Sequence, residues 1–216
     1  MKITINVSHI RAALVAMPRN DIRYYLNGAL IETGSGADES RIVVVATDGH
    51  RLTASDAGPG PREIGQFIIP RTVCENIARF RLPRDAHLYG RDQVELAFDG
   101  LRVTATMFDK TSFGGQLIEG KYPQWRKIVR TTAGQGMGAV LKPRYMAEAL
   151  RFFDALSKRR EHFILIDTDT SDASVLLTES GVPGVMIVMP LKIAAEPSLE
   201  FVQSLIARPV AEEIAA

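Results

Sequence analysis

Residues 2–17 read KITINVSHIRAALVAM and set the pattern for the whole chain. From Lys2 to Asn6 apolar and polar residues alternate, which is typical of a β-strand with one buried face. Ser8 is a residue type that caps helices, and apolar residues then recur at intervals of three and four. The helix face that they form consists of Ile10, Ala13, Leu14 and Met17. The stretch therefore predicts a short strand followed directly by an amphipathic helix capped at Ser8.

The same strand and helix pattern returns twice. Phe67, Ile68 and Ile69 precede Pro70, and we expect a helix there that turns Val73, Ile77 and Phe80 inward. Ala139 to Leu141 precede Pro143, which suits a first helical turn. The apolar stripe of this third helix is predicted to be Met146, Ala149, Leu150, Phe153 and Leu156, with Arg144, Glu148 and Arg151 on another face.

Three strand-like runs separated by turn residues follow each helix. They are 24–33, 42–47 and 51–55; 87–96, with Gly90 as a turn or bulge, 101–108 and 111–119; and 162–168, 174–179 and 185–191. The chain is thus predicted to repeat a βαβββ unit three times. The helix starts lie 63 and 72 residues apart, which excludes the short periods of common solenoids. Amphipathic helices behind antiparallel strands indicate an α+β fold.

Composition limits the function classes. The 216 residues are 46% hydrophobic, enough for one large or two small domains, and the net charge of +1 gives no bulk attraction to nucleic acid. Positive charge is nevertheless concentrated in residues 8–23, 70–84 and 142–160, which carry +2, +3 and +4 and leave −8 elsewhere. The basic helix faces are either solvated or directed at DNA.

The cellular setting follows from cysteine usage and hydropathy. Cys74 is the only cysteine, so no disulfide forms within the chain and a reducing compartment is expected. The N-terminus has no apolar signal region, and no run reaches transmembrane length. We expect a soluble, cytoplasmic protein without a membrane partner.

Five short strings are too specific to follow from composition. They are RYYLNG (23–28), ATDGHRL (46–52), IPR (69–71), GKYPQWRKI (120–128) and VMPLK (188–192). In this order they resemble the beta subunit of DNA polymerase III, the bacterial sliding clamp. The first four look like its middle domain, and the last looks like its extreme C-terminus.

The resemblance implies a clamp fold with antiparallel sheets outside and helices inside, in a truncated arrangement. Residues 1–130 match the middle domain with two units, and residues 131–193 match half of the last domain with one unit. Nothing matches the first domain, and residues 194–216 form a tail. Met1 lies directly before the first strand, so we expect a gene product that begins there.

In the clamp family a hydrophobic cleft between the middle and last domains takes short peptides of partner proteins, such as DNA polymerases with clamp-binding motifs. Read alone, Asp48-Gly49-His50 is only a turn, but the assembled strings favour the pocket. Aliphatic and Met side chains would form its adaptable floor. Its residues would be Leu26, Thr47, Gly49, His50, Arg51, Leu52, Pro123, Lys127, Ile128, Ile187, Met189, Pro190, Leu191 and Ile193.

The resemblance also implies non-specific contact with the phosphates of duplex DNA. Arg71 stands where the family has a DNA-contacting residue at the start of an inner helix, whereas Thr72 replaces a second basic residue of the family. Further candidates, chosen by helix face, are Arg11, Arg79, Arg144 and Arg151.

No catalytic or metal-binding constellation is evident. His50 beside Asp48 and the thiol of Cys74 lack a partner, no histidine has metal-ligand spacing, and no phosphate-binding loop is present. We therefore expect that the protein is not an enzyme and binds no cofactor. The leading prediction is a DNA replication or repair processivity factor, with a clamp loader as a further expected partner. The alternatives are a pocket-only adaptor or regulator, or a clamp-fold DNA-binding initiator.

The odd number of units predicts self-association. In the clamp family two units form one domain and twelve close a ring, so the third unit here lacks a mate within the chain. We hypothesise that the third units of two chains pair, and that four chains form a tetrameric ring with two-fold contacts. In the tail, Ser198 could cap a short helix ended by Pro209. That helix either covers an exposed edge or presents Gln203-Ser204-Leu205 to a pocket as an internal competitor.

Overall fold

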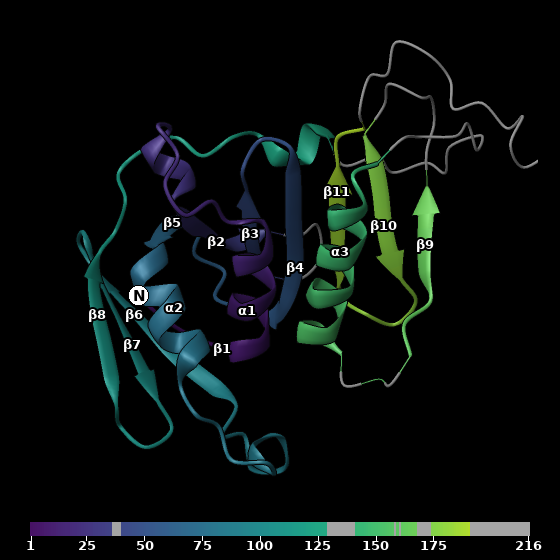
Figure 1. Ribbon diagram of the computed structural model, residues 1–216. Coiled ribbons are helices and arrows are strands. Elements are labelled where there is room, and N and C mark those ends of the chain that lie inside the picture. Colours follow the sequence, from purple (N-terminus) through teal and green to yellow (C-terminus); the bar gives the residue numbers. More distant parts are fainter. Residues whose placement is uncertain (36–39, 129–140, 158, 160, 168–173, 191–216) are drawn as a thin grey trace, which may run out of the picture.

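The computed structural model describes residues 1–35, 40–128, 141–157, 159, 161–167 and 174–190. Three α-helices, three short 3-10 helices and eleven strands make up this part of the chain (Figure 1). The helices are α1 (Val7–Ala16), α2 (Arg71–Arg79), α3 (Pro143–Leu156), η1 (Tyr24–Leu26), η2 (Ala86–Tyr89) and η3 (Trp125–Ile128). The strands are β1 (Lys2–Asn6), β2 (Gly28–Ser35), β3 (Arg41–Thr47), β4 (Arg51–Pro59), β5 (Gly65–Pro70), β6 (Gln93–Asp99), β7 (Arg102–Met107), β8 (Ser112–Gln116), β9 (Ile164–Asp167), β10 (Val175–Glu179) and β11 (Gly184–Val188).

The strands form two antiparallel sheets, in the orders β1-β6-β7-β8 and β5-β2-β3-β4-β11-β10-β9. We call β1, α1 and β2 to β4 the first unit, β5, α2 and β6 to β8 the second, and α3 with β9 to β11 the third. The first two units exchange their leading strands, since β1 pairs with β6 and β5 pairs with β2. The strand predicted at 139–141 falls largely outside the described residues.

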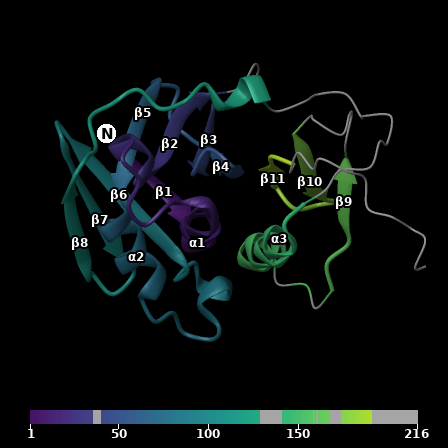
Figure 2. The ribbon, with the colours of Figure 1, turned by 45° about the horizontal axis from the view of Figure 1, so that its top comes forward.

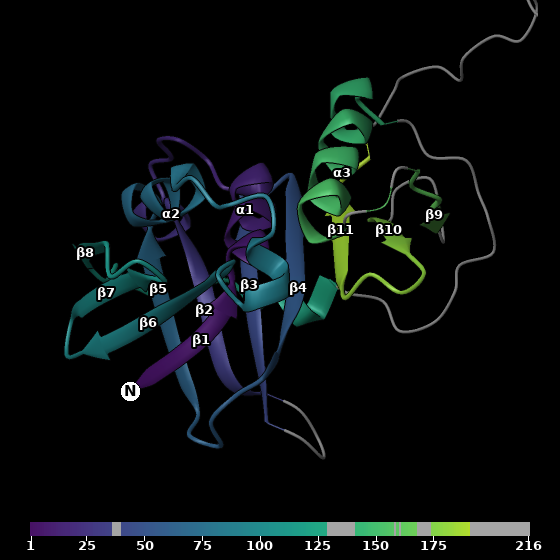
Figure 3. The same ribbon diagram turned by 90° about the horizontal axis from the view of Figure 1, so that it is seen from below.

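The three helices lie side by side on one side of the strands, with α1 between α2 and α3 (Figures 2 and 3). The last strand of the first unit, β4, pairs with the last strand of the third, β11, in five register pairs from Arg51↔Val188 to Ser55↔Gly184. The predicted α+β fold of helices backed by antiparallel sheets is confirmed. No helix in the described part is long and apolar enough to cross a membrane.

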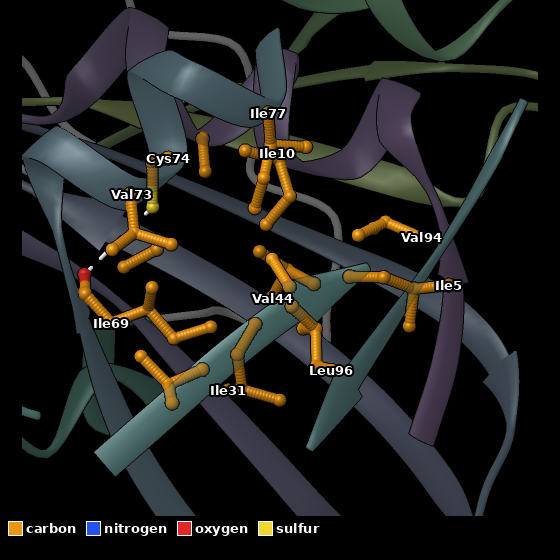
Figure 4. Close-up of a cluster of buried hydrophobic side chains, with 14 of the residues drawn as sticks. Ile5, Ile10, Ile31, Val44, Ile69, Val73, Cys74, Ile77, Val94 and Leu96 are labelled. Carbon is orange, nitrogen blue, oxygen red and sulfur yellow. Dashed lines mark hydrogen bonds between the residues drawn. The ribbon is translucent and has the colours of Figure 1, made fainter. Parts of the chain in front are cut away.

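A continuous apolar core holds the first two units together (Figure 4). Side chains of both sheets, such as Ile31 and Leu96, meet Ile10 of α1 and Ile77 of α2, and all four are fully buried. Cys74 lies in this core without exposure, and burial raises the pKa of its thiol to about 12. The thiol therefore remains protonated at neutral pH, which makes it inert as a nucleophile.

Three local predictions were wrong. The N-cap of α1 is Asn6 rather than Ser8, because the helix begins directly after β1 and the Asn6 side chain accepts a hydrogen bond from the Ser8 N–H at 2.9 Å. Residues 24–26 and 87–89, predicted as strand, lie in the 3-10 helices η1 and η2. In the first, Leu26 donates to the Arg23 carbonyl three residues earlier, and in the second Gly90 ends the turn at a φ of 63°.

The buried face of α3 also differs from the prediction. Leu150 is 46% exposed, whereas Tyr145, Glu148 and Phe152 are buried. The helix packs against its own strands and also against α1, whose Ala12 belongs to the same apolar cluster. This second contact rotates the stripe and buries Glu148 at the junction of the first and third units.

Candidate functional site

A cavity of about 230 Å³ opens where β4 meets β11. Its floor is apolar: Leu26, Leu52 and Ile187 are at most 2% exposed, and Leu52 faces Ile187 across the strand pair. Met189 lies at the rim with 42% exposure, and its N–H donates to the His50 carbonyl at 2.8 Å. Four segments distant in sequence, around residues 23–26, 47–52, 123–125 and 187–189, thus converge on one hollow.

The structure brings together nine of the fourteen residues expected here. Those that line the cavity are Leu26, Thr47, Gly49, His50, Arg51, Leu52, Pro123, Ile187 and Met189. Lys127 on η3 and Pro190 after β11 do not line it. The side chain of Ile128, and Leu191 and Ile193, lie outside the described residues. The binding role of the set remains a prediction.

The ATDGHRL string folds into a hydrogen-bonded turn at the cavity mouth. The Thr47 hydroxyl donates to the Arg51 carbonyl at 2.8 Å and accepts from the Gly49 N–H at 3.0 Å. The Asp48 carboxylate accepts the His50 N–H at 2.9 Å. Gly49 has a φ of 86°, a left-handed conformation that glycine adopts without steric cost. These hydrogen bonds define the shape of the rim.

Arg23 fixes this turn from outside. Its guanidinium binds both Asp21 oxygens at 2.8 and 2.9 Å and donates to the Asp48 carbonyl at 2.9 Å. The hydrogen bonds from Arg23 lower the pKa of Asp21 to about 2. Sequence reasoning missed Arg23 as a lining residue, together with Tyr25, Gln124 and Trp125. All four stand inside RYYLNG and GKYPQWRKI, so these motifs already contained the signal.

Arg51 has a structural task at the pocket wall. Its guanidinium nitrogens lie 3.0 Å from carboxylate oxygens of Asp48 and of Glu148 on α3, and it donates to the Val15 carbonyl at 3.1 Å. The Tyr145 ring lies beneath it at 5.5 Å. The Arg51 side chain is only 9% exposed. Two carboxylates within the protein thus balance the charge of Arg51. The side chain therefore contributes to the pocket mainly as part of its wall.

Comparison with known proteins agrees with this geometry. Residues 5–124, more than half of the chain, match the family model described as "DNA polymerase III beta subunit, central domain". This chain belongs to the DNA polymerase III beta subunit family. The resemblance expected from the five strings is therefore confirmed.

Curated relatives of this family match the same region. The beta sliding clamp of Pseudomonas aeruginosa is 35% identical over 116 residues, which are 53% of this chain and 29% of that protein. The beta sliding clamp of Escherichia coli K12 is 31% identical over 121 residues, 56% of this chain and 30% of that protein. The match thus spans less than a third of each relative's length.

Solved structures of the family share the fold over a longer range. The P. aeruginosa beta subunit matches with a TM-score of 0.61 and 21% identity, over 89% of this chain and 67% of that one. The Bacillus subtilis sliding clamp matches with 0.71 and 14%, over 89% and 64%. The structural match covers 89% of this chain, so the fold likeness extends past residue 124, where the family model ends, and into the third unit.

The five candidate DNA-contacting arginines differ in side-chain exposure and in how many hydrogen bonds they form within the protein. Arg71 binds Glu75 at 2.7 Å and donates to the carbonyls of Met17 and Pro18, with 18% of its side chain exposed. Arg11 donates to carbonyls at the end of α2. Both guanidiniums are largely engaged in holding α1 and α2 in place.

The other three candidates are exposed. Arg79 and Arg151 are 73% and 66% exposed and, with Arg11, line one open hollow of about 710 Å³ between the ends of the helices. Arg144 is 67% exposed, 3.6 Å from Glu148. The structure thus brings Arg11, Arg79 and Arg151 together, while Arg71 and Arg144 lie outside this hollow; DNA contact at any of the five remains a prediction.

Proposed function

We propose that the chain is a sliding-clamp-type processivity factor of DNA replication or repair. Its pocket would bind short apolar peptides of DNA polymerases and other proteins with clamp-binding motifs. The observation that carries this proposal is the cavity at the β4–β11 junction, with its floor of Leu26, Leu52 and Ile187 and its hydrogen-bonded polar rim. The proposed activity is binding, without a chemical step.

The size and lining of the cavity favour a peptide over a small metabolite. At about 230 Å³ it is smaller than the roughly 300–1,000 Å³ of typical small-molecule pockets, so it suits a few apolar side chains of a longer ligand. Met189 supplies an adaptable wall, and Gln124 offers a polar group that would orient a peptide. The Helicobacter pylori beta clamp, which shares the fold at a TM-score of 0.70, has been solved bound to a DNA ligase peptide.

A peptide-binding measurement tests the pocket. Fluorescence anisotropy with a labelled polymerase-derived clamp-binding peptide should show saturable binding, and Met189→Lys should weaken it at least about tenfold by placing a charge in an apolar hollow. Leu88→Lys is the matched control, because Leu88 is 69% exposed on η2, away from the cavity. Equal affinity of both variants, or absence of binding by the wild type, would reject the proposal.

We further propose non-specific association with duplex DNA along the helix layer, and self-association through the third unit. The third unit exposes Phe163, Leu165 and Ile166 at 77%, 65% and 49% near β9, its outermost strand. Such apolar surface favours a partner. Pairing of third units would join two chains, and four chains would supply the units of a closed ring.

A pocket-only adaptor or regulator is the second candidate, favoured by the engagement of Arg71 and Arg11 within the protein. The two readings differ in how DNA holds the protein. A ring should remain on circular duplex DNA at high salt and slide off after linearisation. An adaptor should bind the peptide without any such topological retention.

A further inference from the structure

Strand β8 occupies the position in the second unit that β4 occupies in the first. Each is the third strand after its helix, and each stands last in its unit's row of strands. The free side of β4 is covered by β11 in five register pairs. Among the described strands β8 pairs only with β7, and it forms the left edge of the molecule in Figure 1. The repeat that builds one strand junction therefore leaves an equivalent edge open.

Two backbone hydrogen bonds at the ends of β8 show which of its groups point outward. Met107 N–H donates to the Thr111 carbonyl at 2.8 Å, and Leu117 N–H donates to the Leu101 carbonyl at 2.7 Å. In an antiparallel pair the inward-bonded residues alternate. Residues 113 and 115 therefore bond to β7, and Ser112, Gly114 and Gln116 direct their N–H and C=O groups to the open side.

This edge lacks the devices that usually protect one. Proteins blunt free edges with charges, proline or bulges. The strand reads Ser-Phe-Gly-Gly-Gln and pairs with β7 in an unbroken register from Ser112↔Thr106 to Gln116↔Arg102. The open edge of β8 can therefore accept a further β-strand.

Gly114 supplies a second observation. A Cβ at Gly115 would lie 2.5 Å from Val73, so packing against α2 explains that glycine. A Cβ at Gly114 would meet only the Val103 carbonyl at 3.9 Å, and its φ is not in the left-handed region. Nothing within the described chain demands glycine there. Glycine in a strand often marks the close approach of another backbone.

We propose that β8 pairs antiparallel with β8 of a second copy of this chain, about a two-fold axis at Gly114. In this register Gly114 faces Gly114, Ser112 faces Gln116, and Phe113 faces Gly115 of the second copy. Every outward N–H and C=O then finds a partner, giving about six backbone hydrogen bonds. The segment is self-complementary, since polar meets polar and the aromatic ring meets glycine, as an isologous contact requires.

This contact goes beyond the pocket and does not depend on it. Within the proposed ring it would be the second of two contacts: third units pair at one end of the chain, and β8 strands pair at the other. Each is symmetric by itself, so the β8 contact is testable whether or not the ring closes.

Disulfide trapping tests the register. Gly114→Cys places two thiols in a hydrogen-bonded pair with Cα atoms about 5.5 Å apart, within the range of disulfides. Under a mild oxidant such as oxidised glutathione, most of the chain should become a covalent dimer. Thr104→Cys is the control, since Thr104 faces Gly114 from β7 and its copies would lie about three strand spacings, roughly 14 Å, apart. Cys74 is buried and does not compete.

Charge variants supply the second test. Ser112→Lys with Gln116→Lys places like charges in both outer pairs, and light scattering should show half the mass of the wild-type species. Ser112→Lys with Gln116→Glu places opposite charges there and should keep the wild-type mass. Peptide affinity should be unchanged in both, which separates this contact from the pocket. A wild type that is monomeric up to about 100 micromolar, an equal mass for both variants, or equal cross-linking at Thr104 would overturn the proposal.

Discussion

The Nε atom of Arg51 lies 3.0 Å from a carboxylate oxygen of Glu148, and the two side chains are 9% and 10% exposed. Arg51 begins β4 in the first unit, and Glu148 lies within α3 in the third. A buried charge left without its partner is strongly destabilising. The ion pair therefore links the packing of α3 against the first unit to the β4–β11 junction. Residues of this junction also line the pocket.

Replacing Glu148 by Ala should lower the free energy of unfolding by about 3 kcal/mol, because Arg51 keeps only Asp48 as a counter-ion. Urea unfolding measures the loss, and hydrogen exchange should show it first in β11, with β6 and β7 still protected. Arg144→Ala is the control, since that exposed arginine lies 3.6 Å from Glu148 and should cost less than about 1 kcal/mol. Equal exchange across all strands would contradict the coupling.

Gly49 and Gly58 allow a matched comparison, because their φ angles are 86° and 100°. Alanine at either position adds backbone strain of about 1–2 kcal/mol. A Cβ at Gly49 would also lie 2.8 Å from the Arg23 guanidinium, whereas one at Gly58 meets nothing within 4 Å. Thermal unfolding should show similar losses for both variants. Peptide affinity should fall only for Gly49→Ala, and an equal fall for both would contradict the role of Arg23.

Much of the fold was predictable because its signals are local. Alternation located the strands of both sheets, and helical spacing placed α1, α2 and α3. The pocket was predictable for a different reason: eight of its nine predicted lining residues sit in motif strings, and Ile187 directly precedes one. Gly49 illustrates this, since its turn conformation follows from the Asp48-Gly49-His50 string itself.

The features that could not be predicted depend on contacts between residues far apart in the sequence, which no local pattern indicates. Glu148 reads as a solvated helix residue until Arg51, 97 positions earlier, is seen beside it. Arg71 reads as a free cation at a helix start, but the carbonyls of Met17 and Pro18 come within its reach only after α1 and α2 pack. Asn6 became the cap of α1 because β1 and the helix share one residue boundary.

His9 should make stability fall with acid. Burial lowers its pKa from 6.5 to about 4, partly opposed by nearby Asp56, and its ring contacts the Ser55 hydroxyl at 3.0 Å. The unfolded chain binds the proton first, so stability is complete above about pH 6.5 and falls by up to about 3 kcal/mol towards pH 4. His9→Gln should remove this component in urea titrations. His87→Gln, at an exposed site, should not.

His162 should act in the opposite direction. Its ring nitrogens lie 2.7 Å from Glu179 and 2.8 Å from Asp154, and these contacts, Glu179 first, raise its pKa. The stabilisation is complete below the unfolded value of about 6.5 and is lost as pH rises through the folded pKa. NMR titration should place the His162 midpoint above the ordinary histidine value of about 6.5. Glu179→Gln should lower it more than Asp154→Asn, and the reverse order would contradict the assignment.

The proposed DNA surface contains arginines with exposed side chains, Arg79 and Arg151, and Arg71, whose side chain is only 18% exposed; Arg79 also pairs with Glu75 at 2.9 Å. Arg79 and Arg151 share one open hollow, so replacing both by Ala should weaken binding to duplex DNA about tenfold at low salt and reduce the salt slope by about two. The effect should be equal for unrelated sequences, because phosphate contacts carry no base information. Arg71→Ala should instead lower the unfolding temperature, since it removes a counter-ion from Glu75 and the donor to the Met17 carbonyl.

Salt-dependent anisotropy with two unrelated duplexes measures the first effect, and thermal unfolding measures the second. Arg62→Ala removes the same charge from an exposed loop outside the helix layer and is the control for net charge. If Arg62→Ala weakens binding per charge as much as Arg79→Ala and Arg151→Ala do, the attraction is diffuse and the helix layer has no special role. If Arg71→Ala alone abolishes DNA binding while stability is unchanged, its hydrogen bonds to the Met17 and Pro18 carbonyls must open on DNA, and exposure does not decide which arginines contact DNA.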